Sequence, residues 1–349
     1  MPVSVEALGG RPLWTKTQRN LAGGAGIEAI RVALVNNMPD AALEDTELQF
    51  FDLLDAASDN LPVVVTLYSI TGVPRSERGI RRIDSFYYGL NDLWNSQVDA
   101  MIMTGTEPQQ ANLPQEPYWA NLAKVLDWAE RNTHSTVLSC LAAHAGVLHS
   151  DGIERHRLSD KRFGVFEFPI PSSHPLTRGV GATMRFPHSR WNEVRAQELE
   201  SCGYTILTRS AEAGVDCFVK RKKQSLFLHF QGHPEYQAHT LFKEYRRDIK
   251  RYLRHERDTY PTAPAGYFGE QATSCLMDFR QKAVANRREE AMAEFPETFL
   301  TGSLENGWRP SAVSIYRNWL QLIAEKKAEA FSYAPVGVRR SGNTLQWME

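Results

Sequence analysis

One cysteine stands where a strand is expected to turn directly into a helix. Ser135–Ser139 reads as a buried strand, and the small residues that follow Cys140 begin a helix at once. Such a turn exposes the side chain at its apex, and the helix N-terminus below stabilises a thiolate and offers N–H groups to an oxyanion. Cys140 is therefore a candidate nucleophile. A buried structural cysteine is the alternative, because this side chain also packs as a small apolar group.

A histidine and a glutamate follow the end of a second expected strand. Ser225–Phe230 runs into Gly232, and His233–Pro234–Glu235 comes directly after it. The proline fixes the backbone, so that His233 and Glu235 can project to the same side. Glu235 would then orient the imidazole, and His233 would take a proton from a thiol or an alcohol. Taken alone, the pair fits a surface turn equally well; together with Cys140 it predicts a catalytic triad.

Cys140, His233 and Glu235 follow the ends of expected strands, and the order of strands and helices in the sequence predicts an α/β fold. Continuous apolar strands alternate with helices in the first half, which predicts a mostly parallel sheet with helices on both faces. The strands expected there are Ile30–Val35, Leu61–Ile70, Val98–Met103 and Ser135–Ser139, with helices to about Ala57 and over Leu122–Asn132. Shorter strands follow at Phe163–Phe168, Thr183–Phe186, Tyr204–Arg209, Asp216–Lys220 and Ser225–Phe230. They indicate either an antiparallel annex or a mixed edge of the same sheet.

The chain divides into three expected regions. Residues 1–27 are rich in glycine and weakly patterned, which predicts an N-terminal arm. Residues 28–257 form the α/β domain, which closes with a charged helix over Leu241–Glu256. Residues 258–349 form a C-terminal helical extension, with helices expected over Glu270–Glu294 and Ser311–Lys327.

Composition excludes several classes of protein. The formal net charge of −1 leaves no broad positive field for binding nucleic acid. The sequence does not begin with basic residues followed by an apolar stretch, so no signal peptide is expected. It also contains no run of about 20 apolar residues, so no membrane span is expected. The four cysteines lie far apart without metal-ligand spacing, so free thiols and no metal site are expected. We therefore expect a cytoplasmic protein that binds small molecules.

Several short motifs, dispersed along the chain, give a resemblance to a known family. They are Val35–Asn36–Asn37–Met38–Pro39, Thr104–Gly105, Cys140, Asp151–Gly152–Ile153, Gly164–Val165–Phe166–Glu167, Pro187–His188–Ser189–Arg190 and Gly232–His233–Pro234–Glu235–Tyr236. From about Arg31 to Asp248 the chain resembles the homoserine O-acyltransferases, often called homoserine O-succinyltransferases. That family shares its fold with the class I glutamine amidotransferases, so the resemblance implies an amidotransferase-like fold.

The resemblance also implies roles for individual residues. Cys140 resembles the family's acyl-thioester nucleophile, His233 its general base and Glu235 the residue that orients the base. Lys161, Ser189 and Arg247 stand where the family has substrate-binding residues. A guanidinium such as that of Arg247 can hold an amino-acid carboxylate with two hydrogen bonds, although a surface helix charge is the alternative reading of this residue.

The implied reaction is acyl transfer from an acyl-CoA co-substrate to the hydroxyl of L-homoserine, in methionine biosynthesis and with no bound cofactor. Cys140 would carry the acyl group between two half-reactions, which predicts ping-pong kinetics. A homodimer is expected from the frequency of dimers among soluble enzymes.

The chain departs from the family pattern at two loops. The family often has two lysines after the motif that ends at Pro39, whereas Asp40–Ala41–Ala42 stands here. Gln109 occupies the position tied to acyl-donor choice, where the family usually has glycine or glutamate. A neutral amide does not repel a carboxylate and can donate a hydrogen bond to it, so Gln109 favours succinyl over acetyl.

Three other functions remain open at this point. The acceptor could be serine or another hydroxy amino acid, since one methylene changes pocket discrimination by only about 1–3 kcal/mol. A glutamine amidotransferase-type hydrolase would carry the same triad, although glycines usually flank its nucleophile and Ser139 and Leu141 do so here. A sensor or binding protein built on this scaffold would have no need of the triad.

Overall fold

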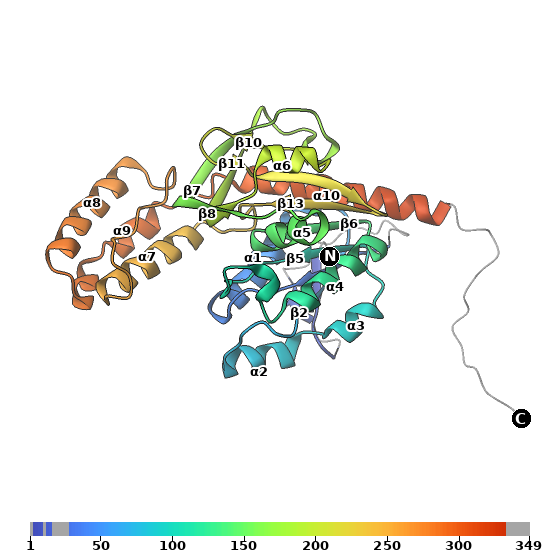
Figure 1. The fold of residues 1–349 in the computed structure, drawn as a ribbon, viewed down its shortest axis with the longest axis horizontal. Coiled ribbons are helices and arrows are strands. Elements are labelled where there is room, and N and C mark those ends of the chain that lie inside the picture. Colours follow the sequence, from blue (N-terminus) through green and yellow to red (C-terminus); the bar gives the residue numbers. More distant parts are fainter. Residues whose placement is uncertain (1–2, 10–11, 16–27, 333–349) are drawn as a thin grey trace, which may run out of the picture.

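The computed structural model describes residues 3–9, 12–15 and 28–332 (Figure 1). Within those residues a nine-stranded sheet forms in the order β2-β1-β4-β3-β5-β6-β13-β12-β9. Neighbouring strands from β1 to β13 in this order are parallel, while β2, β12 and β9 pair antiparallel at the two edges. The strands are β1 (Val3–Glu6), β2 (Pro12–Thr15), β3 (Ile30–Val35), β4 (Val63–Tyr68), β5 (Ala100–Met103), β6 (Ser135–Ser139), β9 (Thr205–Ile206), β12 (Cys217–Lys222) and β13 (Ser225–Phe230).

Three of these strands have the bounds expected from the sequence. β3, β6 and β13 begin and end at the predicted residues, and almost all of their side chains are buried. Continuous burial is the consequence of helices on both faces, and it is why these strands read as unbroken apolar runs. The mostly parallel α/β fold is therefore confirmed.

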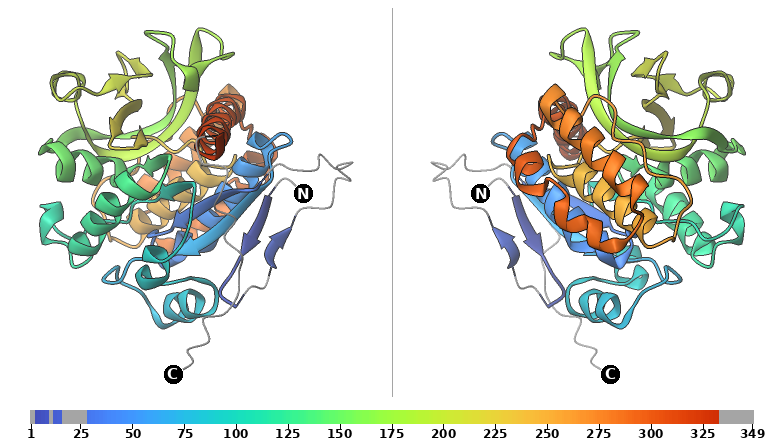
Figure 2. Two further views of the ribbon diagram at one scale, coloured as in Figure 1. Left: turned by 90° about the vertical axis from the view of Figure 1, so that its right-hand side faces the viewer. Right: turned by 90° about the vertical axis from the view of Figure 1, so that its left-hand side faces the viewer.

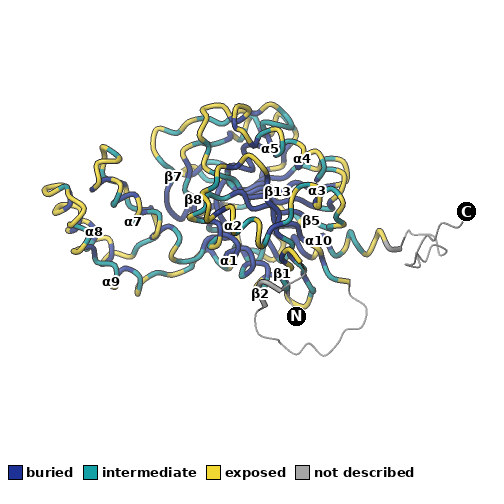
Figure 3. Tube along the Cα trace, turned by 90° about the horizontal axis from the view of Figure 1, so that it is seen from below, coloured by how far each residue is buried: buried dark blue, intermediate teal, exposed yellow. Residues whose placement is uncertain are grey.

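Helices cover both faces of the sheet (Figure 2). Helices α1 and α10 pack on one face, together with the hairpin of β7 and β8, and helices α3, α4 and α5 pack on the other. Figure 3 shows the strands as the buried centre of the molecule. The helices are α1 (Asp40–Ala57), α2 (Glu77–Phe86), α3 (Leu90–Trp94), α4 (Trp119–Asn132), α5 (Leu141–Asp151), α6 (Ala196–Ser201), α7 (Thr240–Leu253), α8 (Glu270–Ala285), α9 (Glu297–Gly302) and α10 (Arg309–Ser332). Helices α2 and α3 were not expected from the sequence, and no described helix is long and apolar enough to cross a bilayer.

The short strands of the second half form both an antiparallel annex and a mixed edge of the main sheet, the two arrangements that the sequence left open. β7 (His156–Pro169) and β8 (Thr183–Glu193) form a separate antiparallel hairpin, and β10 (Arg209–Ser210) pairs with β11 (Gly214–Val215). β12 and β9 instead extend the main sheet as an antiparallel edge. The chain therefore has both an annex and a mixed edge.

The first and last described elements, β1 and α10, are joined to the central sheet. β1 pairs with β4, so the predicted arm contributes a strand to the sheet, while residues 16–27 lie outside the described residues. At the other end, Trp319 of α10 donates its indole N–H to Ser135 Oγ over 2.9 Å. Lys327 of α10 pairs with Asp99 over 2.8 Å. Boundaries at residues 28 and 258 remain a prediction.

The C-terminal helices themselves differ in one place from the expectation. Helix α8 ends at Ala285, and the last residues of the predicted helix form a separate 3₁₀ turn over Glu289–Glu294. Asn286 leaves the helical conformation with φ −136° and ψ 79°. Asparagine favours such breaks because its side chain competes for backbone hydrogen bonds. Helices α7, α8 and α9 form a lobe at one end of the molecule with its own apolar core (Figure 1).

Candidate active site

Cys140 occupies a strained turn between β6 and α5. Its backbone has φ 53° and ψ −112°, which non-glycine residues rarely adopt. Its N–H donates to Phe230 O over 2.8 Å, and its carbonyl accepts from Ala143 N over 3.0 Å, so both strand and helix hold the turn. Such strain persists only where the surroundings over-determine the conformation. All four cysteines, Cys140 included, have free thiols.

His233 and Glu235 form a buried pair beside that turn. His233 Nδ1 lies 2.8 Å from Glu235 Oε1, and Ser139 Oγ donates to the same carboxylate oxygen over 3.2 Å. Both side chains are buried, and the pairing leaves the other ring nitrogen of His233 for Cys140. Burial alone would lower the pKa of His233, but charge and hydrogen-bond interactions with Cys140 and Glu235 hold this pKa well above its usual range.

The three triad residues meet because their strands are neighbours. β6 and β13 pair in parallel with Ser139 opposite Phe230, so the residues that follow them emerge at the same edge of the sheet. In open parallel sheets this carboxyl edge is where ligands bind. The structure therefore brings Cys140, His233 and Glu235 together at this edge.

Gly232 explains how the chain passes from β13 to His233. A Cβ at this position would lie 2.8 Å from each of Asp216 Oδ1, His188 Nε2 and Pro187 O. Only glycine fits there without displacing backbone, and the next N–H, that of His233, donates to Pro187 O over 2.9 Å. The glycine before the histidine is thus a steric requirement of the site.

A second cluster brings together the three residues expected to bind substrate. Lys161 Nζ and Ser189 Oγ both reach Glu244 Oε2, at 3.4 Å and 2.5 Å, and Arg247 Nη2 lies 3.8 Å from the same oxygen. Arg247 also donates to Asp248 Oδ1 over 3.0 Å. Burial lowers the pKa of Arg247, but the neighbouring carboxylates of Asp248 and Glu244 raise it above its ordinary value.

Tyr236 connects this cluster to the triad. Its ring stacks on His233 with centroids 4.1 Å apart, and its hydroxyl donates to Glu244 Oε1 over 2.9 Å. Tyr236 and Glu244 were not expected as site residues. One signal for them exists in the sequence: Glu244, Arg247 and Asp248 have the three- and four-residue spacing of one helix face.

The loop after β5 forms another side of the site. A Cβ on Gly105 would lie 2.9 Å from Leu141 N, so this loop packs directly against the start of α5. Leu141 is the first residue of α5, and its N–H has no acceptor within the helix. Gln109, further along the loop, is exposed, and its side chain makes no hydrogen bond to any described residue.

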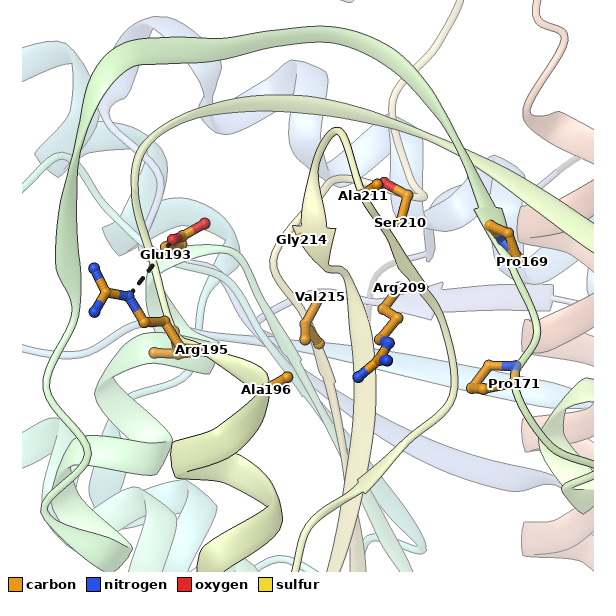
Figure 4. A pocket seen from close by; sticks show the side chains of 11 residues that line it. Pro169, Pro171, Glu193, Arg195, Ala196, Arg209, Ser210, Ala211, Gly214 and Val215 are labelled. Atoms are coloured by element: carbon orange, nitrogen blue, oxygen red, sulfur yellow. Dashed lines mark ion pairs between the residues drawn. The ribbon is translucent and has the colours of Figure 1, made fainter.

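A hollow of about 580 Å³ lies apart from the triad, where the β7–β8 hairpin meets α6 and β10–β11 (Figure 4). Glu193, Arg195 and Arg209 line it, with Arg195 3.8 Å from Glu193. Gln231 connects the wall of this hollow to α5, the helix that follows Cys140. Its Oε1 accepts from Val194 N in the wall over 2.8 Å and lies 2.9 Å from His144 Nε2 in α5. The hollow contains none of the triad residues.

Comparisons with known proteins identify the family of the chain. Residues 13–329 match the family model described as homoserine O-succinyltransferase. A homoserine O-succinyltransferase of Rhodopseudomonas palustris is 43% identical over 302 residues, which cover 86% of this chain and 90% of the relative. One from Methylorubrum extorquens is 42% identical over 301 residues, covering 86% and 89%.

A solved glutamine amidotransferase of Thermotoga maritima aligns with 85% of this chain and 99% of its own, at 12% identity and a TM-score of 0.47. The matches to the family model and to the curated relatives extend over most of the described residues, the triad and the second cluster included. The chain therefore belongs to the homoserine O-succinyltransferase family, and the enzyme is an O-acyltransferase.

Proposed function

We propose that this enzyme transfers a succinyl group from succinyl-CoA to the hydroxyl of L-homoserine, through an acyl-cysteine at Cys140, in methionine biosynthesis. The observation that carries the proposal is a cysteine on a strained strand-to-helix turn beside a buried His233–Glu235 pair. This arrangement suits a nucleophile that must be exposed, deprotonated and held at a helix N-terminus. No bound cofactor is needed, because the acyl-CoA is a co-substrate.

In the first half-reaction the Cys140 sulfur attacks the thioester carbonyl. The tetrahedral oxyanion accepts hydrogen bonds from the Leu141 N–H and from the loop that begins at Gly105. The carbon–sulfur bond to coenzyme A then breaks, and the protonated His233 gives its proton to the departing thiolate. A succinyl group remains on Cys140 as a thioester, which keeps it activated for the second step.

In the second half-reaction the acceptor hydroxyl attacks this thioester. His233, now neutral, removes the hydroxyl proton as the new carbon–oxygen bond forms, and Cys140 leaves as a thiolate that restores the starting state. Glu235 stabilises the imidazolium formed on His233. The proton taken from homoserine replaces the one given to coenzyme A, so the cycle is balanced.

The second cluster suits the two charged ends of an amino acid. Lys161, Ser189 and Arg247 supply N–H and O–H donors for the acceptor's carboxylate, and Glu244 supplies a carboxylate for its ammonium group. The stacking of Tyr236 on His233 holds this cluster next to the base that must take the hydroxyl proton.

A donor-by-acceptor experiment tests the proposed function. Succinyl-CoA and acetyl-CoA are each combined with homoserine and serine, and release of the coenzyme A thiol is followed. We expect the highest kcat/KM for succinyl-CoA with homoserine, and a succinyl mass on the Cys140 peptide when the acceptor is omitted. An unlabelled Cys140 would reject the covalent scheme, a preference for serine would reject the acceptor, and ammonia release from glutamine would indicate a hydrolase instead.

Replacing Gly105 with Ala is expected to lower kcat by about 100- to 1,000-fold, because losing one oxyanion donor has effects of this order. The added methyl carbon would meet Leu141 Cβ at 2.6 Å and Leu141 N at 2.9 Å, which forces the N–H away from its position. Steady-state kinetics with both donors measure the change. Gly302→Ala is the matched control, since a Cβ there meets nothing within 4 Å. Unchanged kcat in Gly105→Ala would show that the Leu141 N–H is not an oxyanion donor.

A further inference from the structure

Arg155 reaches from the turn after α5 to the loop that carries Gln109. Its Nη2 donates to Ala111 O over 3.1 Å, two residues beyond Gln109 in the sequence. This contact places a guanidinium against the loop of Gln109, which the family resemblance associates with the choice of acyl donor. Arg155 belongs to neither the triad nor the second cluster.

The guanidinium of Arg155 has no ion-pair partner among residues 28–332. Its acidic neighbour is Glu116, whose Oε1 accepts from the Gln110 N–H at 2.6 Å and whose Oε2 is buried without a hydrogen-bond partner, so Glu116 does not form an ion pair with Arg155. None of the Arg155 nitrogens is buried without a partner, so those not bound to Ala111 are open to solvent. Arg247 differs, because Asp248 already accepts two of its hydrogen bonds. Arg155 is thus a half-buried cation with donors to spare.

Arg155 also lies within the electrostatic field of the nucleophile. Burial lowers the pKa of Arg155 below its ordinary value, and electrostatic interactions with neighbouring groups, Glu116 and Cys140 among them, oppose that shift. Arg190 interacts with Cys140 in the same way. However, its guanidinium is buried and donates to His188, Asn192 O and Ala213 O, so it has little capacity left for a ligand.

Resting on the proposed function, we infer that Arg155 is the group that binds an anionic oxygen group of the acyl donor. That group is either the terminal carboxylate of the succinyl chain or a phosphate of coenzyme A. Both present oxygens in a plane that a guanidinium can hold with two parallel hydrogen bonds. Because Arg155 contacts the loop of Gln109, the two side chains would act on the same donor, Arg155 through its positive charge and Gln109 by adding no charge at its own position.

The test is Arg155→Gln, which removes the charge and keeps an N–H donor that can approach Ala111 O. Three donors are compared with homoserine as acceptor: succinyl-CoA, acetyl-CoA and succinyl-N-acetylcysteamine, which has the succinyl chain but no nucleotide. We expect kcat/KM for succinyl-CoA to fall by about 10- to 100-fold, the range for losing a charge-assisted hydrogen bond. The matched control is Arg157→Gln, because the Arg157 guanidinium lies over the Trp191 ring, 4.5 Å from its centroid.

The pattern across donors separates the two sources. Loss with both succinyl donors and not with acetyl-CoA identifies the carboxylate, and loss with both CoA donors and not with the short thioester identifies a phosphate. An equal loss with all three donors, or no loss, overturns the inference, since a merely structural Arg155 would not discriminate among them. If instead the unmodified enzyme fails to label Cys140 with any donor, the proposed function fails and Arg155 is not at issue.

Discussion

Cys140→Gly is expected to be inactive yet more stable than Cys140→Ala by about 1 kcal/mol, because only glycine relieves the backbone strain. Elsewhere glycine is the less stable of the two by about 0.5–1 kcal/mol, so the order should be reversed at this residue. The reason is the conformation at Cys140, φ 53° and ψ −112°, in which a Cβ crowds its own backbone. Both variants lack the nucleophile, and acyl transfer should fall by about 10⁴-fold or more.

Urea unfolding of the two variants measures this order, and thiol release measures activity. The comparison of glycine with alanine cancels the loss of the sulfur, which both variants share. Cys202→Ala is the matched control for a thiol outside the site and should retain full activity. A glycine variant less stable than the alanine variant would show that the turn is not strained, and residual acyl transfer near the level of the unmodified enzyme would exclude Cys140 as the nucleophile.

Glu235→Gln is expected to lower kcat/KM by about 10⁴-fold, an effect of the size found when a base loses its orienting carboxylate. The amide keeps the shape of the side chain and removes the charge that His233 faces at 2.8 Å. Without that charge the pKa of His233 falls, because burial lowers this pKa and only Cys140 remains to oppose it. The limb of the pH–rate profile that reports His233 should therefore move to lower pH.

The same substitution changes the pH dependence of stability. The pKa of His233 is raised in the folded enzyme, so its protonation stabilises the fold below its unfolded pKa of about 6.5. This contribution is lost as pH rises through the higher pKa of the folded state. The free energy of unfolding should thus differ most between enzyme and variant at about pH 6, and less at alkaline pH.

Ser139→Ala is the matched control for Glu235→Gln. It removes only the hydrogen bond from Ser139 to Glu235 and leaves the carboxylate opposite His233. The loss in kcat/KM should be smaller than in Glu235→Gln, at most the effect of one hydrogen bond to a charged group, about 1.5–3 kcal/mol. An activity loss in Ser139→Ala as large as that in Glu235→Gln would assign the effect to packing around the carboxylate and not to its charge.

The sequence could predict a candidate triad because each of its members follows a strand with a simple signal. β6 and β13 are buried on both faces, so their apolar runs are unbroken, and the catalytic types stand directly after them. What the sequence could not supply is the adjacency of these strands. They are far apart along the chain, and only the parallel pairing of Ser139 with Phe230 brings Cys140 beside His233.

Other features depend on contacts that leave little local trace. β1 has only four residues, with every second one buried, and it reads as irregular until β4 is placed beside it. Glu244 reads as one charge in a charged helix, and its importance follows from the arrival of Lys161 and Ser189 from the hairpin of β7 and β8. Tyr236 likewise becomes informative through its stacking on His233.

The attachment of α10 has a consequence for synthesis on the ribosome. Its apolar residues cover the face of the sheet that α1 leaves open, and Trp319 bonds to the first residue of β6. A nascent chain that has released only the strands would expose this apolar face to water. The sheet therefore completes its core only after α10, which follows all of the described strands along the chain, has left the exit tunnel.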